Sequence, residues 1–309
     1  MIEENTDTII SVYLQHCQFE KGLSDKTVKA YRIDLIQFAN YVDFDIAICD
    51  KALMQNYLSH LHKRYKTKSV KRKIASLKAF FTYLVEEEIL HTTPFDKLRI
   101  KLHEPFLLPR TIPLSSINQI LRSAYKRKDT LRSKSPYQYN ACLRDIAVLE
   151  LLFATGMRVS ELCSLRYSSI DLQDGVIKIY GKGSKERIIQ VSNPDVLAAM
   201  NSYYCAFSDK IHEVGWFFVN RLGNRLSDQS VRHMINAYVN LSAINQHITP
   251  HMFRHSFATL LLEEDVDIRY IQQLLGHSSI TTTQIYTHVT SKKQRDILTS
   301  KHPRNRIKI

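Results

Sequence analysis

Three prolines in a stretch without apolar periodicity, Pro105, Pro109 and Pro113, most constrain how this chain can fold. Proline has no backbone N–H and stiffens extended segments, so a helix cannot continue through such a stretch. We therefore predict a boundary between two domains. The expected parts are a first domain at residues 1–103, a linker at 104–113 and a second domain at 114–309.

Before the prolines, apolar residues recur at helical spacing and glycine is rare. Ser24 is a favourable N-cap residue, and Val28, Tyr31 and Leu35 then fall on one face, as expected of an amphipathic helix. The same reasoning predicts four helices, at about 8–19, 24–42, 51–65 and from residue 67 onward. The first domain is therefore expected to be helical throughout.

After the prolines the pattern predicts a mainly helical domain with one small antiparallel β-sheet. Helices are expected at about 115–124 and 143–154, and the polar, basic residues 126–140 between them are expected to form an exposed loop. Alternating residues at 176–180 and 187–191 flank a glycine-containing turn and predict a hairpin. The remainder of the chain again favours helices.

The charge of the chain favours a polyanionic partner. Lysine and arginine number 43 against 30 acidic residues, a net charge of +13, which attracts nucleic acid but also fits a merely soluble basic surface. Part of this charge is a run without an acid: Lys63, Arg64, Lys66, Lys68, Lys71, Arg72 and Lys73. We predict that this run contacts DNA phosphates, with a solvated helix face as the alternative.

The five cysteines are an odd number at wide spacings and include no C-x-x-C pair. A zinc site or a disulfide framework is therefore not expected, and a reducing cytoplasm suits the chain. No apolar run approaches the ~18 residues of a membrane-spanning helix, and the acidic start is unlike a signal peptide. We expect a cytoplasmic protein without a membrane partner, a metal or a cofactor.

His251 and Arg254 lie three residues apart on a helix expected to begin after Pro250. At about 100° per residue they share a polar face, while Phe253 lies on the apolar half. A metal site at His251 and His255 is disfavoured, because no glutamate follows the first histidine and Arg254 would repel a cation. An ordinary solvated face is the alternative to an anion-binding site.

Two further cationic residues lie at predicted turns of the chain. Arg158 follows the helix stop Gly156, and its planar guanidinium suits phosphate oxygens, although Glu161 three residues on allows an ordinary surface pair. Lys182 lies at the hairpin tip between two glycines, where backbone can approach a ligand closely. A solvated turn lysine is the alternative there, and Lys185 could take the same role.

His277 precedes serines that can cap a short helix leading to Tyr286. Several β-branched residues make this segment a poor helix former, so we expect it to be loosely held. One tyrosine among 16 is ordinarily a packing residue. Tyr286 becomes a nucleophile candidate when it is taken together with the other residues.

Four short sequences carry these residues: Ala154–Leu162 (ATGMRVSEL), His251–Arg254 (HMFR), Leu275–His277 (LGH) and Gln284–Tyr286 (QIY). Together they resemble the tyrosine recombinases, and the Xer-like and phage integrase branch is the most similar. The resemblance covers nearly the whole chain. It implies a helical, SAM-like core-binding domain followed by a catalytic domain, which clamp DNA between them.

The resemblance also implies residue roles. Arg158 and Arg254 would hold the scissile phosphate, and Tyr286 would attack it to give a 3′-phosphotyrosyl link and a free 5′ hydroxyl. A phenol with a pKa of ~10 needs a base and a neutralised phosphate to react at neutral pH. The roles of general acid, proton transfer at the tyrosine, phosphate contact and support of the site would fall to Lys182, His251, His277 and Glu161.

A homotetramer on two double-stranded DNA sites is implied, with C-terminal tails docked on neighbouring subunits and two rounds of exchange through a Holliday junction. Neither ATP nor a metal is needed, because the phosphotyrosine conserves the energy of the broken bond. The resemblance leaves open whether a second recombinase or an accessory protein takes part.

The biological role has several candidates. The long basic loop expected at residues 126–140 favours a mobile-element role, by integration, excision or inversion, over Xer-type resolution of chromosome or plasmid dimers. A type IB topoisomerase would share the chemistry, but the tail and the Xer-like sequences disfavour it. A non-catalytic DNA-binding protein on the same scaffold is the rival from a different class.

Overall fold

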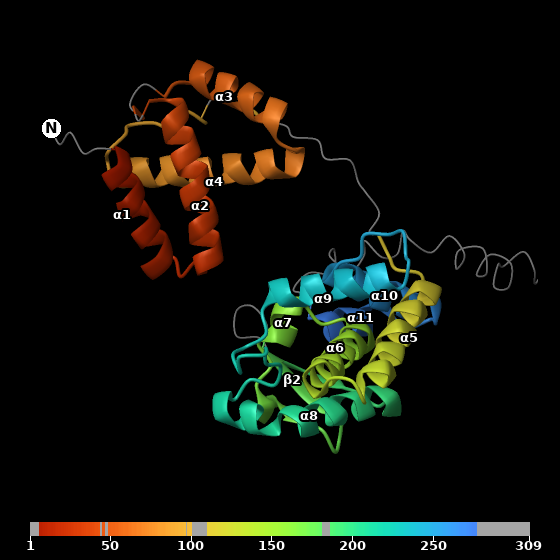
Figure 1. The fold of residues 1–309 in the computed structure, drawn as a ribbon. Helices are drawn as coiled ribbons and strands as arrows, with labels where there is room; N and C mark the ends of the chain where they lie inside the picture. The colour runs from red at the N-terminus through yellow and green to blue at the C-terminus, as the bar shows by residue number, and fades with distance from the viewer. Residues whose placement is uncertain are drawn as a thin grey trace, which may run out of the picture. The chain divides into compact units, whose positions relative to one another are not determined.

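The computed structural model describes residues 6–276 apart from residues 44, 47–48, 97, 101–109 and 181–185. The chain divides into two compact units, Met1–Phe106 and Leu107–Ile309. The described part is mainly helical with one small antiparallel sheet, as predicted (Figure 1). No helix in the described part combines the length and the apolar character needed to cross a bilayer.

The described residues of the first unit form four helices, and the sequence periodicity predicts each of them. Two begin at side-chain caps, because the hydroxyl of Ser24 accepts from the backbone N–H of Thr27 and the carboxylate of Asp50 accepts from that of Leu53. Buried aromatic side chains such as Tyr13 and Phe38 fill the space between them. The helices are α1 (Thr6–Phe19), α2 (Asp25–Tyr41), α3 (Lys51–Arg64) and α4 (Thr67–Glu86).

The second unit is arranged around one buried helix, α6, which packs against α5, α8 and α10 (Figure 1). Most of the side chains in its second half are buried, as predicted for residues 143–154. The described helices of this unit are α5 (Leu114–Leu131), α6 (Pro136–Thr155), α7 (Val159–Cys163), α8 (Pro194–Val214), α9 (Asp228–Leu241), α10 (Pro250–Glu263) and α11 (Ile268–Leu275).

A three-stranded antiparallel sheet completes the second unit, with the strand order β1 (Ile170–Asp171), β2 (Val176–Tyr180) and β3 (Glu186–Gln190). β2 and β3 form the predicted hairpin. In its register Ile177 pairs with Ile189 and Ile179 pairs with Arg187. Because side chains alternate along a strand, Arg187 shares the inward face with buried Ile189.

The prediction of an exposed loop at residues 126–140 is wrong. α5 continues to Leu131, and α6 begins at Pro136 behind the N-cap Ser135. The basic residues that suggested a loop are good helix formers, and two of them lie over aromatic rings, Lys128 over Tyr125 and Arg127 over Tyr238. A polar sequence therefore forms a helix here because its cations cover apolar surface.

Candidate functional site

The junction between α6 and α7 sets the position of Arg158. Gly156 ends α6 with a left-handed φ of +58°, and an added Cβ there would lie 2.5 Å from Cδ1 of Phe257. Glycine is therefore required for both the backbone conformation and the close approach of α10. Arg158 follows as the N-cap residue of α7, and its backbone N–H donates to the carboxylate of Glu161 at 2.8 Å.

Glu161 is the centre of a charged network at this junction. Its side chain is 6% exposed, and Nη1 of Arg158 lies 2.7 Å from one carboxylate oxygen. The guanidinium of Arg187 donates to both oxygens, at 3.1 Å and 2.7 Å. Burial acts to raise the pKa of Glu161, but the hydrogen bonds and charges of Arg187 and Arg158 outweigh it and hold that pKa below its usual value.

Arg254 joins three elements of the site. It projects from α10, whose Met252 and Phe253 are buried in the core, and it is itself 5% exposed. Its guanidinium donates to the carbonyl of Gly156 at 2.9 Å and to the carbonyl of Leu275 at 2.7 Å. Both acceptors lie at the C-terminal end of a helix, where backbone carbonyls lack helical partners and a cation is favoured.

The two histidines of α10 differ in their surroundings. His251 lies in the first turn of α10 and is exposed. His255 is partly buried, and burial, followed by the nearby charges of His251 and Arg254, lowers its pKa to about 4. His255 is therefore neutral at physiological pH, whereas Arg254 beside it carries a permanent positive charge.

Arg187 is the residue that sequence reasoning missed. The alternating pattern predicts a strand residue and no role in the site, yet the side chain of Arg187 is 11% exposed and its Nε donates to the carbonyl of Leu274 at 3.0 Å. One signal was available in the sequence. With a period of two, Arg187 falls on the face of Ile189 and Val191, and a charged residue on the buried face of a strand requires a partner.

The structure thus brings together Arg158, Glu161 and Arg254 of the predicted site and adds Arg187. His251 lies one turn before Arg254 on α10 and is exposed. The remaining predicted members, Lys182 with its alternative Lys185, His277 and Tyr286, lie outside the described residues. Among the residues that the structure describes, no three histidine, cysteine or carboxylate side chains converge as a metal would need. The groups that converge carry guanidinium forks, which suit the oxygens of a phosphate.

The basic run of the first unit has two parts. Lys63, Arg64, Lys66, Lys68 and Lys71 are exposed. Lys73 differs from the prediction, because its side chain is 3% exposed and its ammonium lies 2.9 Å from the buried carboxylate of Asp34. Arg72, which is 45% exposed, bonds the same carboxylate. The ammonium of Lys73 is therefore turned into the domain, where Asp34 is its partner.

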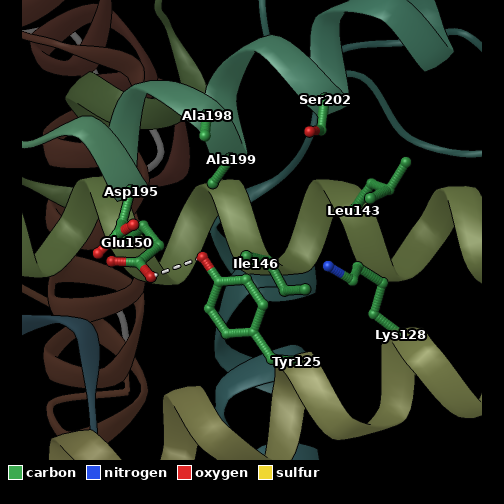
Figure 2. Close-up of a pocket in the computed structure, with 9 residues that line it drawn as sticks. All are labelled: Tyr125, Lys128, Leu143, Ile146, Glu150, Asp195, Ala198, Ala199 and Ser202. Atoms are coloured by element: carbon green, nitrogen blue, oxygen red, sulfur yellow. Dashed lines mark hydrogen bonds between the residues drawn. The ribbon is translucent and has the colours of Figure 1, made fainter.

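A hollow of about 290 Å³ lies between α5, α6 and α8, separate from the charged network (Figure 2). Tyr125 donates its hydroxyl to Glu150 at 2.9 Å, and Asp195 lies beside Glu150. Burial raises the pKa of Glu150, partly offset by the hydrogen bond from Tyr125, and Asp195 raises it further. Arg158, Glu161, His251 and Arg254 do not line this hollow.

Both units match models of known protein families. The family model described as "Phage integrase family" matches residues 116–293, and the model "Phage integrase, N-terminal SAM-like domain" matches residues 10–88. A tyrosine recombinase of Agathobacter rectalis is 54% identical over 97% of this chain and 98% of its own. Tyrosine recombinase XerC of Thermodesulfovibrio yellowstonii is 33% identical over 97% of each chain.

The fold is also similar to that of a solved recombinase. The crystal structure of the XerH site-specific recombinase bound to its palindromic difH substrate, a post-cleavage complex, matches with a TM-score of 0.75. The match covers 96% of this chain and 84% of that one, at 20% sequence identity. At this identity the likeness describes the fold.

Proposed function

The chain belongs to the phage integrase family of tyrosine recombinases, and from this premise we propose that it cuts and rejoins DNA at specific sites through a phosphotyrosyl link on Tyr286. The observation that carries the proposal is the convergence of Arg158 and Arg254 on the α6–α7 junction, with Glu161 behind them. Two fixed guanidiniums there can neutralise one phosphate.

Cleavage is a transfer at phosphorus. The phenol oxygen of Tyr286 bonds to the phosphorus, and the bond from phosphorus to the 5′ oxygen breaks, which leaves the strand as a 3′-phosphotyrosyl ester. Lys182 gives its proton to the leaving 5′ oxygen, and His251 takes the proton of the phenol. His277 contacts the phosphate. Rejoining is the same transfer in reverse, with a 5′ hydroxyl of the other duplex as the nucleophile.

Stoichiometry supports a tetramer. Exchange between two duplexes requires four strands to be cut, and each subunit supplies one Tyr286. Four subunits on two sites therefore complete the exchange through a Holliday junction, with the C-terminal tail as the contact between neighbours. In the first unit, the exposed cations Lys63, Arg64, Lys66, Lys68 and Lys71 are suited to the DNA backbone.

The biological setting is a second part of the proposal. The mobile-element role was favoured by a long basic loop at residues 126–140, and these residues lie mostly in α5 and α6. The match to XerC along nearly the whole of both chains supports instead a two-domain recombinase of Xer type. We therefore favour recombination between two short core sites, as in dimer resolution, over integration by a larger complex.

A nicked DNA substrate tests the chemistry. DNA flanking the gene in its host supplies candidate sites. A nick beside the cleavage point lets the short fragment that bears the free 5′ hydroxyl diffuse away, so rejoining is prevented and the adduct is trapped. Incubation without metal, followed by a denaturing gel, should show a covalent protein–DNA complex. Tyr286→Phe should bind the site with the affinity of the wild type and form no adduct.

The rivals predict other outcomes. A non-catalytic DNA-binding protein would shift the DNA in a native gel and would form no adduct at any concentration. A type IB topoisomerase would relax supercoiled plasmid as a monomer and would not join strands from two duplexes. An adduct with Tyr286→Phe would place the nucleophile elsewhere and remove the present assignment.

A further inference from the structure

We propose that Arg187 is a positioning residue for DNA cleavage, which ties the Arg158–Glu161 pair to the C-terminal end of α11, three residues before His277. This inference rests on the proposed function. It assigns a role to a residue outside the set that the sequence pattern picked out. It also predicts that a strand residue controls how the phosphate-binding arginine is held relative to the segment that leads to Tyr286.

All three nitrogens of the Arg187 guanidinium are used. Nη1 and Nη2 donate to the two oxygens of Glu161, and Nε donates to the carbonyl of Leu274 at 3.0 Å. A planar guanidinium whose three nitrogens are all hydrogen-bonded is held in one orientation. A lysine ammonium at the same place could bond either Glu161 or the Leu274 carbonyl, but not both in this geometry. The residue thus fixes the distance between α7 and α11.

The place of Arg187 in the sheet favours a dedicated role. It pairs with Ile179 and points inward on the face of Ile189, which is 3% exposed. Taking a guanidinium out of water is unfavourable unless it gains charged partners. An aliphatic residue at this position would be the ordinary choice for packing alone.

Arg254 provides a second tether at the same helix end. It donates to the carbonyl of Leu275, next to the Leu274 carbonyl that Arg187 holds, and also to the carbonyl of Gly156. Consecutive carbonyls of α11 are therefore bound by two arginines that also reach the α6–α7 junction. Gly276 follows with a φ of +65°, and an added Cβ would lie 2.9 Å from Nη1 of Arg187, so the approach is close.

The charge state of Glu161 depends on the same residue. Two charged groups from two elements face it, Arg158 of its own short helix and Arg187 of β3. Without Arg187 the carboxylate would retain Arg158 and its burial, and burial raises the pKa. A protonated Glu161 would orient the guanidinium of Arg158 less firmly, so cleavage should become sensitive to pH in a range where the wild type is not.

The test compares Arg187→Ala and Arg187→Lys in the full chain, with Arg269→Ala as a matched control, because Arg269 is an exposed arginine in the first turn of the same α11. The rate of adduct formation on the nicked site is measured across pH, with the affinity for the site and the thermal unfolding of each variant. We expect about 100-fold slower adduct formation for Arg187→Ala at neutral pH, as for other losses of positioning, with site affinity nearly unchanged.

The pH profile separates positioning from a merely structural role. Arg187→Ala should show an acid limb displaced to higher pH, with part of the rate recovered as the pH rises. Arg187→Lys keeps a cation beside Glu161, so its acid limb should stay near that of the wild type while its rate remains about tenfold low for want of the Leu274 bond. Arg269→Ala should match the wild type.

Two results would overturn the inference. Wild-type rates in both Arg187 variants would show that the contacts of Arg187 do not control cleavage. Reduced rates that follow the loss of folded protein, with an unshifted acid limb, would assign Arg187 to folding alone. Failure of the proposed function is distinct from both, because the wild type itself would then form no adduct.

Discussion

Glu150 and Glu161 are two buried carboxylates of the same domain, each 7% exposed, whose pKa values are shifted in opposite directions. Glu150 faces the hollow between α5, α6 and α8, accepts a hydrogen bond from Tyr125 and lies near another acid, Asp195. Glu161 lies between two guanidiniums. Burial acts to raise the pKa of both carboxyl groups. At Glu161 the two arginines outweigh burial, and the pKa is lowered.

The difference shows that the charge of the neighbouring side chains, more than the extent of burial, decides the direction in which the pKa of a buried carboxylate shifts. Glu150 serves as a hydrogen-bond acceptor for Tyr125 and so joins α5 to α6. A fully ionised Glu161 holds two guanidiniums in fixed positions, one of them proposed to bind the scissile phosphate.

The largest expected effect on stability follows from replacing Glu161 by a neutral side chain. Glu161→Gln removes the charge that both Arg158 and Arg187 use, which leaves the 11% exposed guanidinium of Arg187 without a counter-charge. Breaking a buried pair in this way should lower the free energy of unfolding by about 3 kcal/mol. Chemical denaturation measures this loss, and a change below about 1 kcal/mol would place Glu161 among ordinary surface pairs.

A pH series should give the two carboxylates opposite slopes. Because the pKa of Glu150 is raised above its usual 4.5, the folded protein keeps a proton that the unfolded chain releases, and its contribution to the free energy of unfolding falls as the pH rises past about 4.5. For Glu161 the unfolded chain binds the extra proton, so the contribution is present above about 4.5 and is lost as the pH falls through the folded pKa.

Denaturation of the wild type, Glu150→Gln and Glu161→Gln from about pH 4 to pH 7 checks these signs. Relative to the wild type, Glu150→Gln should gain stability as the pH rises. The deficit of Glu161→Gln should shrink as the pH falls. Parallel curves for all three proteins would contradict the assigned shifts.

The smallest effect is expected at the hydroxyl of Tyr125. Tyr125→Phe removes one hydrogen bond to Glu150 and keeps the ring that lies beneath Lys128. The loss should be about 1 kcal/mol in the free energy of unfolding, with adduct formation on DNA unchanged. A fall in the cleavage rate would connect the hollow to the site and remove the contrast between the two carboxylates.

Much of the fold could be predicted from the sequence because apolar spacing determines which face of a helix is buried. Val70, Ile74, Leu77 and Phe81 are all buried on α4, as their spacing indicates. The hairpin followed in the same way from alternation in its strands. The end of α5 could not be predicted, because its last turns carry polar helix formers whose helical state depends on contacts made by Arg127 and Lys128.

The site could be predicted in part. Arg158, Glu161 and Arg254 stood out in short motifs and lie together in the structure, whereas Lys182, His277 and Tyr286 stay predictions. Arg187 was missed because a strand pattern describes which face a residue occupies and does not name its partner across 26 residues of sequence.

The burial of Lys73 against Asp34 has a consequence for how salt acts on DNA binding. A protein cation expels a condensed counterion from DNA when it takes that ion's place beside a phosphate, and each such replacement steepens the salt dependence by about 0.9 in the logarithmic slope. The ammonium of Lys73 is already paired with the carboxylate of Asp34 inside the domain, and Arg72 pairs with the same carboxylate. If the exposed part of this run contacts DNA as proposed, fewer ions are released than seven cations would release, and binding through this domain weakens less as the ionic strength rises.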